Sequence, residues 1–420
     1  MQQVLAQRRL RTMAPETAAL PDGGERRHRR VEMPYYRSVG EIPPKRHTQF
    51  ENPDGGLFAE ELMGEEGFSF DSSLLYHKYL PTALQAIEPV DIEDQELTPN
   101  HPLKPRHFRT HQLKAGGDPV TSRHTVLANG DIRISYFTGS ENSPLVKNAV
   151  GDEMVYVEAG SGMLESTFGA VPFASGDYVI IPASTIHRWV IDDAEEPMRA
   201  LIMESTGHIG PPRRYLSRNG QFLERSPYCE RDQHGPNEPL EVEGEDVDVL
   251  VKTRTGTTRF VYKNHPFDVV GWDGCLYPYT FSIHDFEPIT GRVHQPPPVH
   301  QTFEAPNVVV CSFVPRLFDY HPKAIPAPYN HANVDSDEVI FYVDGNFMSR
   351  KGSGIEAGSI SLHPAGHTHG PQPGSVEASL GAEATQELAV MIDTFRPLEL
   401  GPGGRDAEED DYAWTWLGGR

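Results

Sequence analysis

The chain has 420 residues, and its hydrophobic fraction of 37% is large enough to build sizeable cores. A formal net charge of −23 disfavours nucleic acid and anionic membranes as partners. No run of about 18 apolar residues occurs, so no membrane span is expected. The 38 glycines and 37 prolines indicate many turns and short strands, and they argue against a helical bundle.

Residues 1–32 are rich in arginine and lack the apolar stretch of a secretory signal, so we predict a disordered tail. The three cysteines, Cys229, Cys275 and Cys311, lie far apart and form no CxxC pair. This spacing disfavours a disulfide framework or a zinc–thiolate site. It fits a reducing cytoplasm, which is the predicted compartment.

After the tail, residues 33–115 are rich in proline and glycine and are predicted to be irregular, with short strands. Strand-like runs then follow at 131–137, 153–157, 178–181 and 198–203. A polar loop over 210–237 and an acidic linker over 241–248 come next. A second strand-rich region then continues to about Arg396.

These changes in pattern predict a domain organisation. The expected parts are a tail over 1–32, an N-terminal strand-rich domain with an irregular extension over 33–248, a C-terminal strand-rich domain over 249–400 and an acidic tail over 401–420. Trp414 and Trp416 indicate that the end of the acidic tail packs against the protein.

An internal repeat links the two strand-rich regions. The segment Asp152-Glu-Met-Val-Tyr-Val-Glu-Ala-Gly-Ser-Gly resembles Asp337-Glu-Val-Ile-Phe-Tyr-Val-Asp-Gly-Asn-Phe. Farther along, residues 176–187 resemble residues 358–369, and both stretches open with glycine and end in Pro-x4-His. Paired motifs of this kind are similar to those of cupin barrels. The predicted fold is therefore mainly β: a bicupin of two jelly-roll domains.

Three residues of the second copy have the pattern of a cupin metal site: His331, Glu338 and His369. Two imidazoles and one carboxylate on one face of a metal leave the opposite positions open, as in the facial triad of non-haem Fe(II) oxygenases. We therefore predict Fe(II) as cofactor, with a substrate and O2 binding beside it. Asp337 stays an alternative carboxylate. Glu338 is preferred because it directly precedes a strand, as Glu153 does in the first copy.

The first copy is predicted to be a degenerate cupin without metal. It keeps Glu153 and His187, but Val146 stands where the second copy has His331. Two ligands rarely hold Fe(II) against water and competing metals. The C-terminal copy is thus the predicted metal-binding one.

The remaining histidines are judged by their place in the pattern. His363 can share a strand face with His369, so it is a candidate for contact with the substrate or with a ligand. His367 is expected to face solvent or to be structural. His284 follows an aromatic strand and is structural on its pattern alone. His294 lies in a Pro-rich loop and receives no role.

Several segments after Met33 together resemble the homogentisate 1,2-dioxygenase family. The element Leu57-Phe-Ala-Glu-Glu-Leu-Met-Gly resembles the Leu-Tyr-Ala-Glu-Gln-Leu-x-Gly of that family. The segment Pro326-Ala-Pro-Tyr329-Asn-His331 resembles its Pro-Pro-Tyr-Tyr-His segment, and Ser361-Leu-His363 through His369-Gly-Pro resembles its Ser-Leu-His…His-Gly-Pro element. The order and spacing of these motifs are more specific than any one of them.

The resemblance implies an Fe(II)-dependent, ring-cleaving dioxygenase in tyrosine and phenylalanine catabolism. Such an enzyme opens homogentisate with O2 to 4-maleylacetoacetate and incorporates both oxygen atoms. The resemblance also implies His284 as catalytic base toward a substrate phenol, with Tyr329, His363 and His369 against the substrate. Finally, it implies a homo-oligomer, either a trimer or a hexamer.

Three departures from the family concern the substrate side more than the metal side. Six residues separate His331 from Glu338 where the family has five, Ala332 stands in place of an arginine, and Phe347 in place of a pocket tyrosine. A cupin dioxygenase acting on a gentisate or hydroquinone type of substrate therefore stays an alternative. A second alternative is a non-enzymatic bicupin that binds a small molecule.

Overall fold

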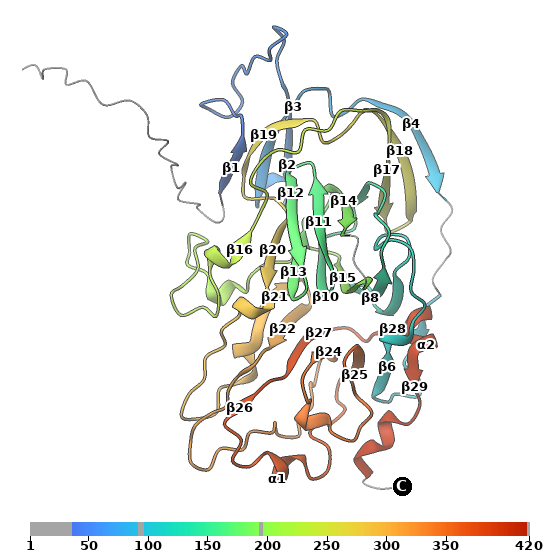
Figure 1. Ribbon diagram of the computed structural model, residues 1–420, viewed down its shortest axis with the longest axis vertical. Coiled ribbons are helices and arrows are strands. Elements are labelled where there is room, and N and C mark those ends of the chain that lie inside the picture. The colour runs from blue at the N-terminus through green and yellow to red at the C-terminus, as the bar shows by residue number, and fades with distance from the viewer. Residues whose placement is uncertain (1–35, 91–95, 193–195, 418–420) are drawn as a thin grey trace, which may run out of the picture. The chain divides into compact units, whose positions relative to one another are not determined.

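Strands, almost all of them antiparallel, are the main regular structure of the described chain, as the glycine- and proline-rich sequence predicts. The computed structural model describes residues 36–90, 96–192 and 196–417, which belong to one compact unit, Met33–Arg420 (Figure 1). The tail predicted over 1–32 lies outside the described residues. Within the described ranges, no helix is both long and apolar enough to cross a membrane.

Two large sheets contain the first copy of the repeat. The nine-stranded sheet has the order β16-β20-β13-β10-β15-β8-β7-β28-β5, with bounds β5 Thr98–Pro99, β7 His124–Ala128, β8 Ile132–Gly139, β10 Glu153–Ala159, β13 Asp177–Ile181, β15 Met198–Ser205, β16 Gln233–His234, β20 Tyr279–Ser282 and β28 Glu399–Leu400. The seven-stranded sheet facing it has the order β12-β11-β14-β9-β17-β18-β4, with bounds β4 Leu84–Val90, β9 Val146–Asn148, β11 Ser161–Ser166, β12 Gly169–Ala174, β14 Ile186–Ile191, β17 Glu245–Thr253 and β18 Gly256–Asn264.

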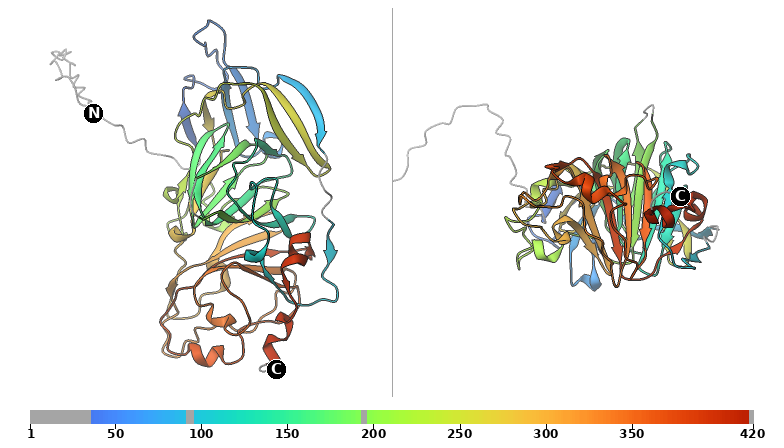
Figure 2. Two further views of the ribbon diagram at one scale, coloured as in Figure 1. Left: turned by 45° about the vertical axis from the view of Figure 1, so that its right-hand side comes forward. Right: turned by 90° about the horizontal axis from the view of Figure 1, so that it is seen from below.

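A second seven-stranded sheet contains the second copy (Figure 2). Its order is β21-β22-β27-β24-β25-β6-β29, with bounds β6 Arg106–Arg109, β21 Gln301–Ala305, β22 Val308–Phe313, β24 Asp337–Asp344, β25 Ser359–His363, β27 Leu388–Thr394 and β29 Glu408–Glu409. Two smaller sheets complete the strands, namely β1-β19-β3-β2 (Arg37–Gly40, Val269–Gly274, Ser72–His77, Ala59–Gly64) and β23-β26 (Arg316–Leu317, Ala384–Thr385).

Helices are few and short in the described chain. They are α1 Ser375–Ser379 and α2 Pro402–Ala407, and the 3₁₀ turns η1 Glu66–Phe68, η2 Thr110–Gln112, η3 Arg213–Tyr215, η4 Glu230–Asp232, η5 Ile283–Asp285, η6 Pro297–His300, η7 Met348–Arg350 and η8 Tyr412–Leu417.

Side-chain alternation along β10 explains how the layers stack. Val155 and Val157 point into a core shared with the facing sheet, where they meet Trp189. Met154 and Tyr156 point to the opposite face of the strand and pack against the sheet of the second copy. The strand is therefore buried on both faces, which accounts for its continuous apolar run.

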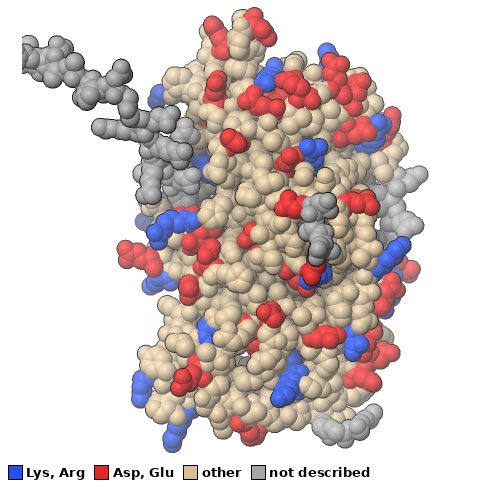
Figure 3. Space-filling view, viewed as in Figure 1, with Lys and Arg blue, Asp and Glu red and all other residues tan. Residues whose placement is uncertain are grey.

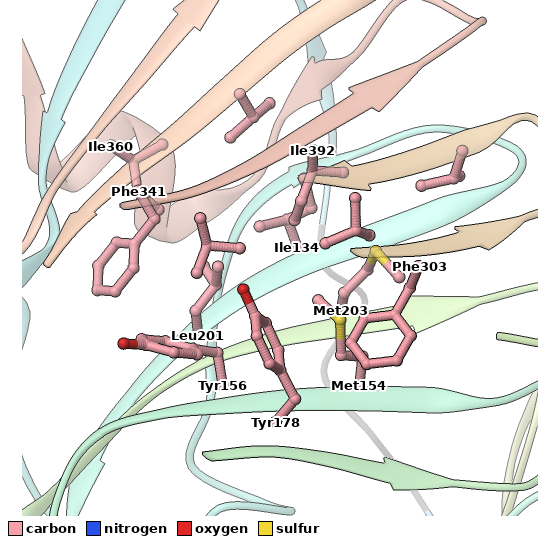
Figure 4. Close-up of a cluster of buried hydrophobic side chains, with 14 of the residues drawn as sticks. Ile134, Met154, Tyr156, Tyr178, Leu201, Met203, Phe303, Phe341, Ile360 and Ile392 are labelled. Atoms are coloured by element: carbon pink, nitrogen blue, oxygen red, sulfur yellow. The ribbon is translucent and has the colours of Figure 1, made fainter. Parts of the chain in front are cut away.

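The two copies meet across one hydrophobic layer. Figure 4 shows Tyr156, Tyr178 and Met203 from the first copy near Phe341 and Ile392 from the second. The rings of Tyr156 and Phe341 lie 6.3 Å apart, edge to face. The opposite face of the second sheet, with Ile340 and Tyr342, packs against loops and η7. The candidate site lies on this face of the second sheet, which points away from the first copy.

The pairing pattern repeats between the copies. In the first, Glu153 lies opposite Ile181 and Glu204; in the second, Glu338 lies opposite His363 and Asp393. The prediction of a mainly β, cupin-type fold is confirmed, and its division into two barrels stays a prediction. Strand pairing crosses the predicted boundary at 248, because β17 pairs with β9 and β6 with β25. The domain limits also stay a prediction.

The surface carries charges of both signs. Figure 3 shows acidic and basic side chains spread over the same face, with the acidic ones prominent. This agrees with the formal net charge of −23.

Candidate metal centre

Strand pairing brings three predicted residues together. His331 and His369 form an isolated antiparallel bridge, with backbone N···O distances of 2.8 and 2.9 Å. Glu338 is the second residue of β24 and points to the same face of the sheet as Ile340. One ligand atom from each of the three residues lies within 4.8 Å of the other two. Glu338 and His369 are each 4% exposed, whereas His331 is only partly buried, so the cluster is enclosed on one side and open on the other.

Hydrogen bonds fix the tautomers of both histidines. Nδ1 of His331 lies 3.0 Å from the carbonyl oxygen of Tyr329, and Nδ1 of His369 lies 3.0 Å from that of His367. A carbonyl only accepts, so each Nδ1 carries the proton and each Nε2 presents a lone pair when the ring is neutral. This is the arrangement that orients imidazole ligands in metal proteins.

These lone pairs converge on a carboxylate that also can only accept. Nε2 of His369 lies 3.1 Å from Oε1 of Glu338, and Nε2 of His331 lies 3.5 Å from Oε2. Facing lone pairs require a cation among them, either a proton or a metal ion. Burial alone would raise the pKa of Glu338. The histidines His331, His363 and His369, when each donates a proton to this carboxylate, hold that pKa well below its usual value. The donor set of two imidazoles and one carboxylate suits a divalent transition metal.

The neighbouring carboxyl, Asp337, has a different environment. Oδ1 accepts a hydrogen bond from the backbone N–H of Ala365, and Oδ2 from that of Leu398, both at 2.8 Å. Asp152 does the same in the first copy, accepting from Ala183 and Ile209. In both copies this aspartate links two turns by accepting backbone hydrogen bonds. In the second copy it is therefore Glu338, and not Asp337, that lies in the cluster.

His363 contacts Glu338 on the buried side of the cluster. Its side chain is fully buried, its Nδ1 lies 2.8 Å from Oε1 of Glu338 and its Nε2 lies 2.9 Å from the hydroxyl of Tyr412. Burial lowers the pKa of His363 to about 3, so the ring is neutral near pH 7. Both ring nitrogens therefore have protein partners. The sequence predicted a role for His363 but not its link to Tyr412.

The C-terminal segment closes this side of the site. The indole Nε1–H of Trp416 donates to the carbonyl of Gly370 at 3.0 Å, and Thr415 accepts from Gln372 at 2.9 Å. The rings of Tyr412 and Trp416 lie 5.2 Å apart. The expectation that the end of the tail packs against the protein is met, and it packs beside the cluster.

On its other side, His331 adjoins a chain of contacts through the exposed side chains of Tyr329 and His294. The ring of Tyr329 is 6.1 Å from that of His331, and its hydroxyl is 3.4 Å from Nε2 of His294. Nδ1 of His294 lies 3.3 Å from a carboxylate oxygen of Asp319. Sequence analysis gave His294 no role, because a histidine in a Pro-rich loop carries no periodic signal. Its contacts with Tyr329 and Asp319 become visible only in the fold.

His284 lies elsewhere in the chain fold. It is exposed in η5, after β20, and its ring packs over Gly176, where an added Cβ would come within 2.8 Å of Nε2. It shares no hydrogen bond, ion pair or ring contact with the three clustered residues in the part of the chain that the structure describes.

In the first copy an arginine stands where the second copy gathers ligands. Nη1 of Arg123 lies 3.3 Å from Glu153 and 3.5 Å from Glu204, and both partners are buried. Burial opposes the charge of Glu153, but Arg123 and its neighbours lower its pKa to about 2. His187 keeps the Nδ1–carbonyl hydrogen bond at 3.0 Å, and Val146 lies opposite it. A fixed guanidinium thus supplies the positive charge there.

Comparison with known proteins gives relatives over most of the chain, although no family model matches. A protein of Saccharolobus solfataricus whose name describes a dioxygenase is 38% identical over 390 residues, covering 91% of this chain and 99% of that protein. Homogentisate 1,2-dioxygenases of Bradyrhizobium diazoefficiens and Emericella nidulans are 25% and 22% identical, cover 90% and 86% of this chain and match over 80% and 82% of their own lengths.

Solved structures give a weaker likeness. A cupin 2 conserved barrel protein from Leptotrichia buccalis is 11% identical with a TM-score of 0.32, covering 74% of this chain and 100% of that chain. A glyoxylate-induced protein from Pseudomonas aeruginosa is 10% identical with a TM-score of 0.33, covering 75% and 97%.

Proposed function

The chain belongs to the homogentisate 1,2-dioxygenase family, and from this premise we propose that it opens the ring of homogentisate with O2 to give 4-maleylacetoacetate. The relatives support a dioxygenase. The substrate, the incorporation of both oxygen atoms and the use of Fe(II) are the proposed parts. The proposed ligands are His331, Glu338 and His369.

One observation supports the proposal most directly. The Nε2 lone pairs of His331 and His369 face the carboxylate of Glu338 while both Nδ1–H groups donate to carbonyls. Fe(II) bound there would supply a Lewis-acidic centre with open positions for a substrate oxygen and for O2.

Residues around the ligands keep the site ready for such a reaction. The Nδ1–H of His363 donates to Glu338 and so holds the carboxylate in one orientation. Tyr412 holds His363 in turn. Burial of this layer keeps water away from the carboxylate, which strengthens its electrostatic interactions.

We propose His294 as the group that takes the proton from a substrate phenol. Asp319 faces Nδ1 of His294, which leaves Nε2 free to accept a proton directly or through Tyr329. The base role that the family resemblance gives to His284 stays a prediction. A His294→Asn variant should lose about 100-fold in kcat/KM, the lower range for a general base, and His284→Asn is the matched comparison. A larger loss in the His284 variant would contradict this assignment.

The experiment that tests the function is O2 consumption after anaerobic loading with Fe(II). Homogentisate, gentisate and hydroquinone are compared, and homogentisate should consume one O2 per ring opened. Uptake with gentisate or hydroquinone alone would support the alternative, a related cupin dioxygenase. No uptake with any aromatic, together with tight binding of homogentisate, would support a non-enzymatic binding protein. The homo-oligomer, a trimer or hexamer, and the cytoplasmic location stay predictions.

A further inference from the structure

Arg350, at the end of η7, is a buried cation that interacts electrostatically with Glu338 and Glu387 but contacts neither as an ion pair. The residue is 6% exposed. Its Nε–H donates to the hydroxyl of Tyr342 at 3.0 Å, and Nη1–H donates to the carbonyl of Gly370 at 2.7 Å. No carboxylate of the described residues forms an ion pair with it. A guanidinium has five N–H groups, and Nη2 makes no hydrogen bond within the described ranges.

Two other enclosed arginines of this protein form the kind of ion pair that Arg350 does not. Arg106, 7% exposed, pairs with Glu408, and Arg123 pairs with Glu153 and Glu204. Buried charges are normally paired because removing a lone charge from water is energetically costly. Burial opposes the charge of Arg350, yet the hydroxyls of Tyr342 and Tyr412 and the charge of Glu338 raise its pKa above the ordinary value, so it stays cationic.

The position of Arg350 connects it to the metal cluster. Gly370, which accepts from Nη1, directly follows His369 in the chain. Tyr342 lies on the same face of β24 as Glu338, and its hydroxyl is 3.1 Å from Oγ of Ser361. Ser361 in turn shares a face of β25 with His363. The guanidinium thus adjoins the same interior that the ligands occupy.

The charges of this interior favour an anionic ligand. A divalent metal on Glu338 leaves one positive charge there, and Arg350 adds a second. Two buried carboxyls lie close to these charges, Asp393 opposite Glu338 on β27 and Glu387 near Arg350. Burial raises the pKa of both, which weakens them as counter-charges. An aromatic substrate that carries a carboxylate would add a negative charge and would accept from the N–H groups of Arg350 that have no protein partner.

We propose that Arg350 is a substrate-binding residue that pairs with the carboxylate of the aromatic substrate and so selects carboxylated hydroquinones over neutral ones. The proposal rests on the proposed function. Charge-assisted hydrogen bonds between a guanidinium and a carboxylate are the strong class, and a planar fork suits two oxygens.

The test measures KM for homogentisate and for hydroquinone, which lacks the carboxylate, in Fe(II)-loaded Arg350→Gln and in the unmodified enzyme. KM for homogentisate should rise about 100-fold, the size expected for losing a hydrogen bond to a charged group, while KM for hydroquinone and the iron content stay unchanged. Arg350→Lys should fall between the two. Lys351→Gln, which removes an exposed charge from the next residue, is the matched control and should change neither KM.

Two outcomes separate the inference from the function. Turnover of homogentisate by the unmodified enzyme, with an equal change of both KM values in Arg350→Gln, overturns the role of Arg350 alone. An unmodified enzyme that consumes no O2 with any aromatic overturns both. If Arg350→Gln does not fold, inhibition of the unmodified enzyme tests whether the site prefers a carboxylate. Phenylacetate should inhibit at least about tenfold more strongly than neutral phenylacetamide, and equal inhibition overturns the proposal.

Discussion

Replacing Tyr412 by phenylalanine tests whether the C-terminal segment supports the metal site. The carboxylate of Glu338 can only accept, so Nδ1 of His363 donates to it and Nε2 accepts from Tyr412 at 2.9 Å. Without the hydroxyl, Nε2 loses its partner in a layer where His363 is fully buried. The proton of His363 is then free to move to Nε2, which turns a lone pair toward Glu338.

The size of the effect follows from that lost partner. A buried polar atom left without a hydrogen bond costs about 1–3 kcal/mol. If the cost falls mainly on the metal-loaded state, Fe(II) affinity drops by roughly 5- to 150-fold. Loss of a partner that orients a metal ligand typically costs about 10- to 100-fold in affinity. We therefore expect Fe(II) to bind about 10- to 100-fold more weakly to Tyr412→Phe.

Competition with a chelator under anaerobic conditions measures that affinity. Tyr156→Phe is the matched control, because its buried hydroxyl has no hydrogen-bond partner among the described residues. That control should bind Fe(II) as the unmodified protein does. The reasoning is refuted if Tyr412→Phe binds Fe(II) within about twofold of the unmodified protein, or if Tyr156→Phe weakens binding equally.

Two further predictions concern metal retention and alkaline stability. His369→Ala should retain no Fe(II) after desalting and His187→Ala a full equivalent, as measured by iron content; the reverse result would mean that the first copy binds the metal. Burial opposes the charge of His77, but its hydrogen bonds with Asp268 and Glu61 raise its pKa to about 9 from 6.5. The raised pKa contributes about 3 kcal/mol to the free energy of unfolding. This contribution is fully present below about pH 6.5 and is lost as the pH rises through the folded pKa. Urea unfolding should show that loss in the unmodified protein and not in His77→Gln, and equal losses in both would argue against it.

The ligand cluster could be predicted from sequence because its signals are local. His369 ends a Pro-x4-His segment that is repeated at His187, and Glu338 stands directly before an apolar strand. Strand periodicity then directs Glu338 to one face and Val339 to the other. Even Asp337 had a visible counterpart in Asp152, although its role in fastening two turns needed coordinates.

The supporting residues could not be predicted because their contacts join distant parts of the chain. Tyr412 reaches His363 only because β29 pairs with β6, which itself pairs with β25. Arg123 precedes the repeated segment and has no counterpart in the second copy. Arg350 is an ordinary arginine in sequence, and only the structure shows that it is buried beside Gly370 without an ion pair among the described residues.

The central claim is that this protein inserts both atoms of O2 into a carboxylated hydroquinone at the cluster of His331, Glu338 and His369. Turnover of homogentisate under ¹⁸O-labelled dioxygen, followed by mass spectrometry of the ring-opened product, tests it most directly. The account predicts a product that carries both labelled atoms, and no product from Glu338→Gln. A product with one labelled atom or none, or equal turnover by Glu338→Gln, would contradict it.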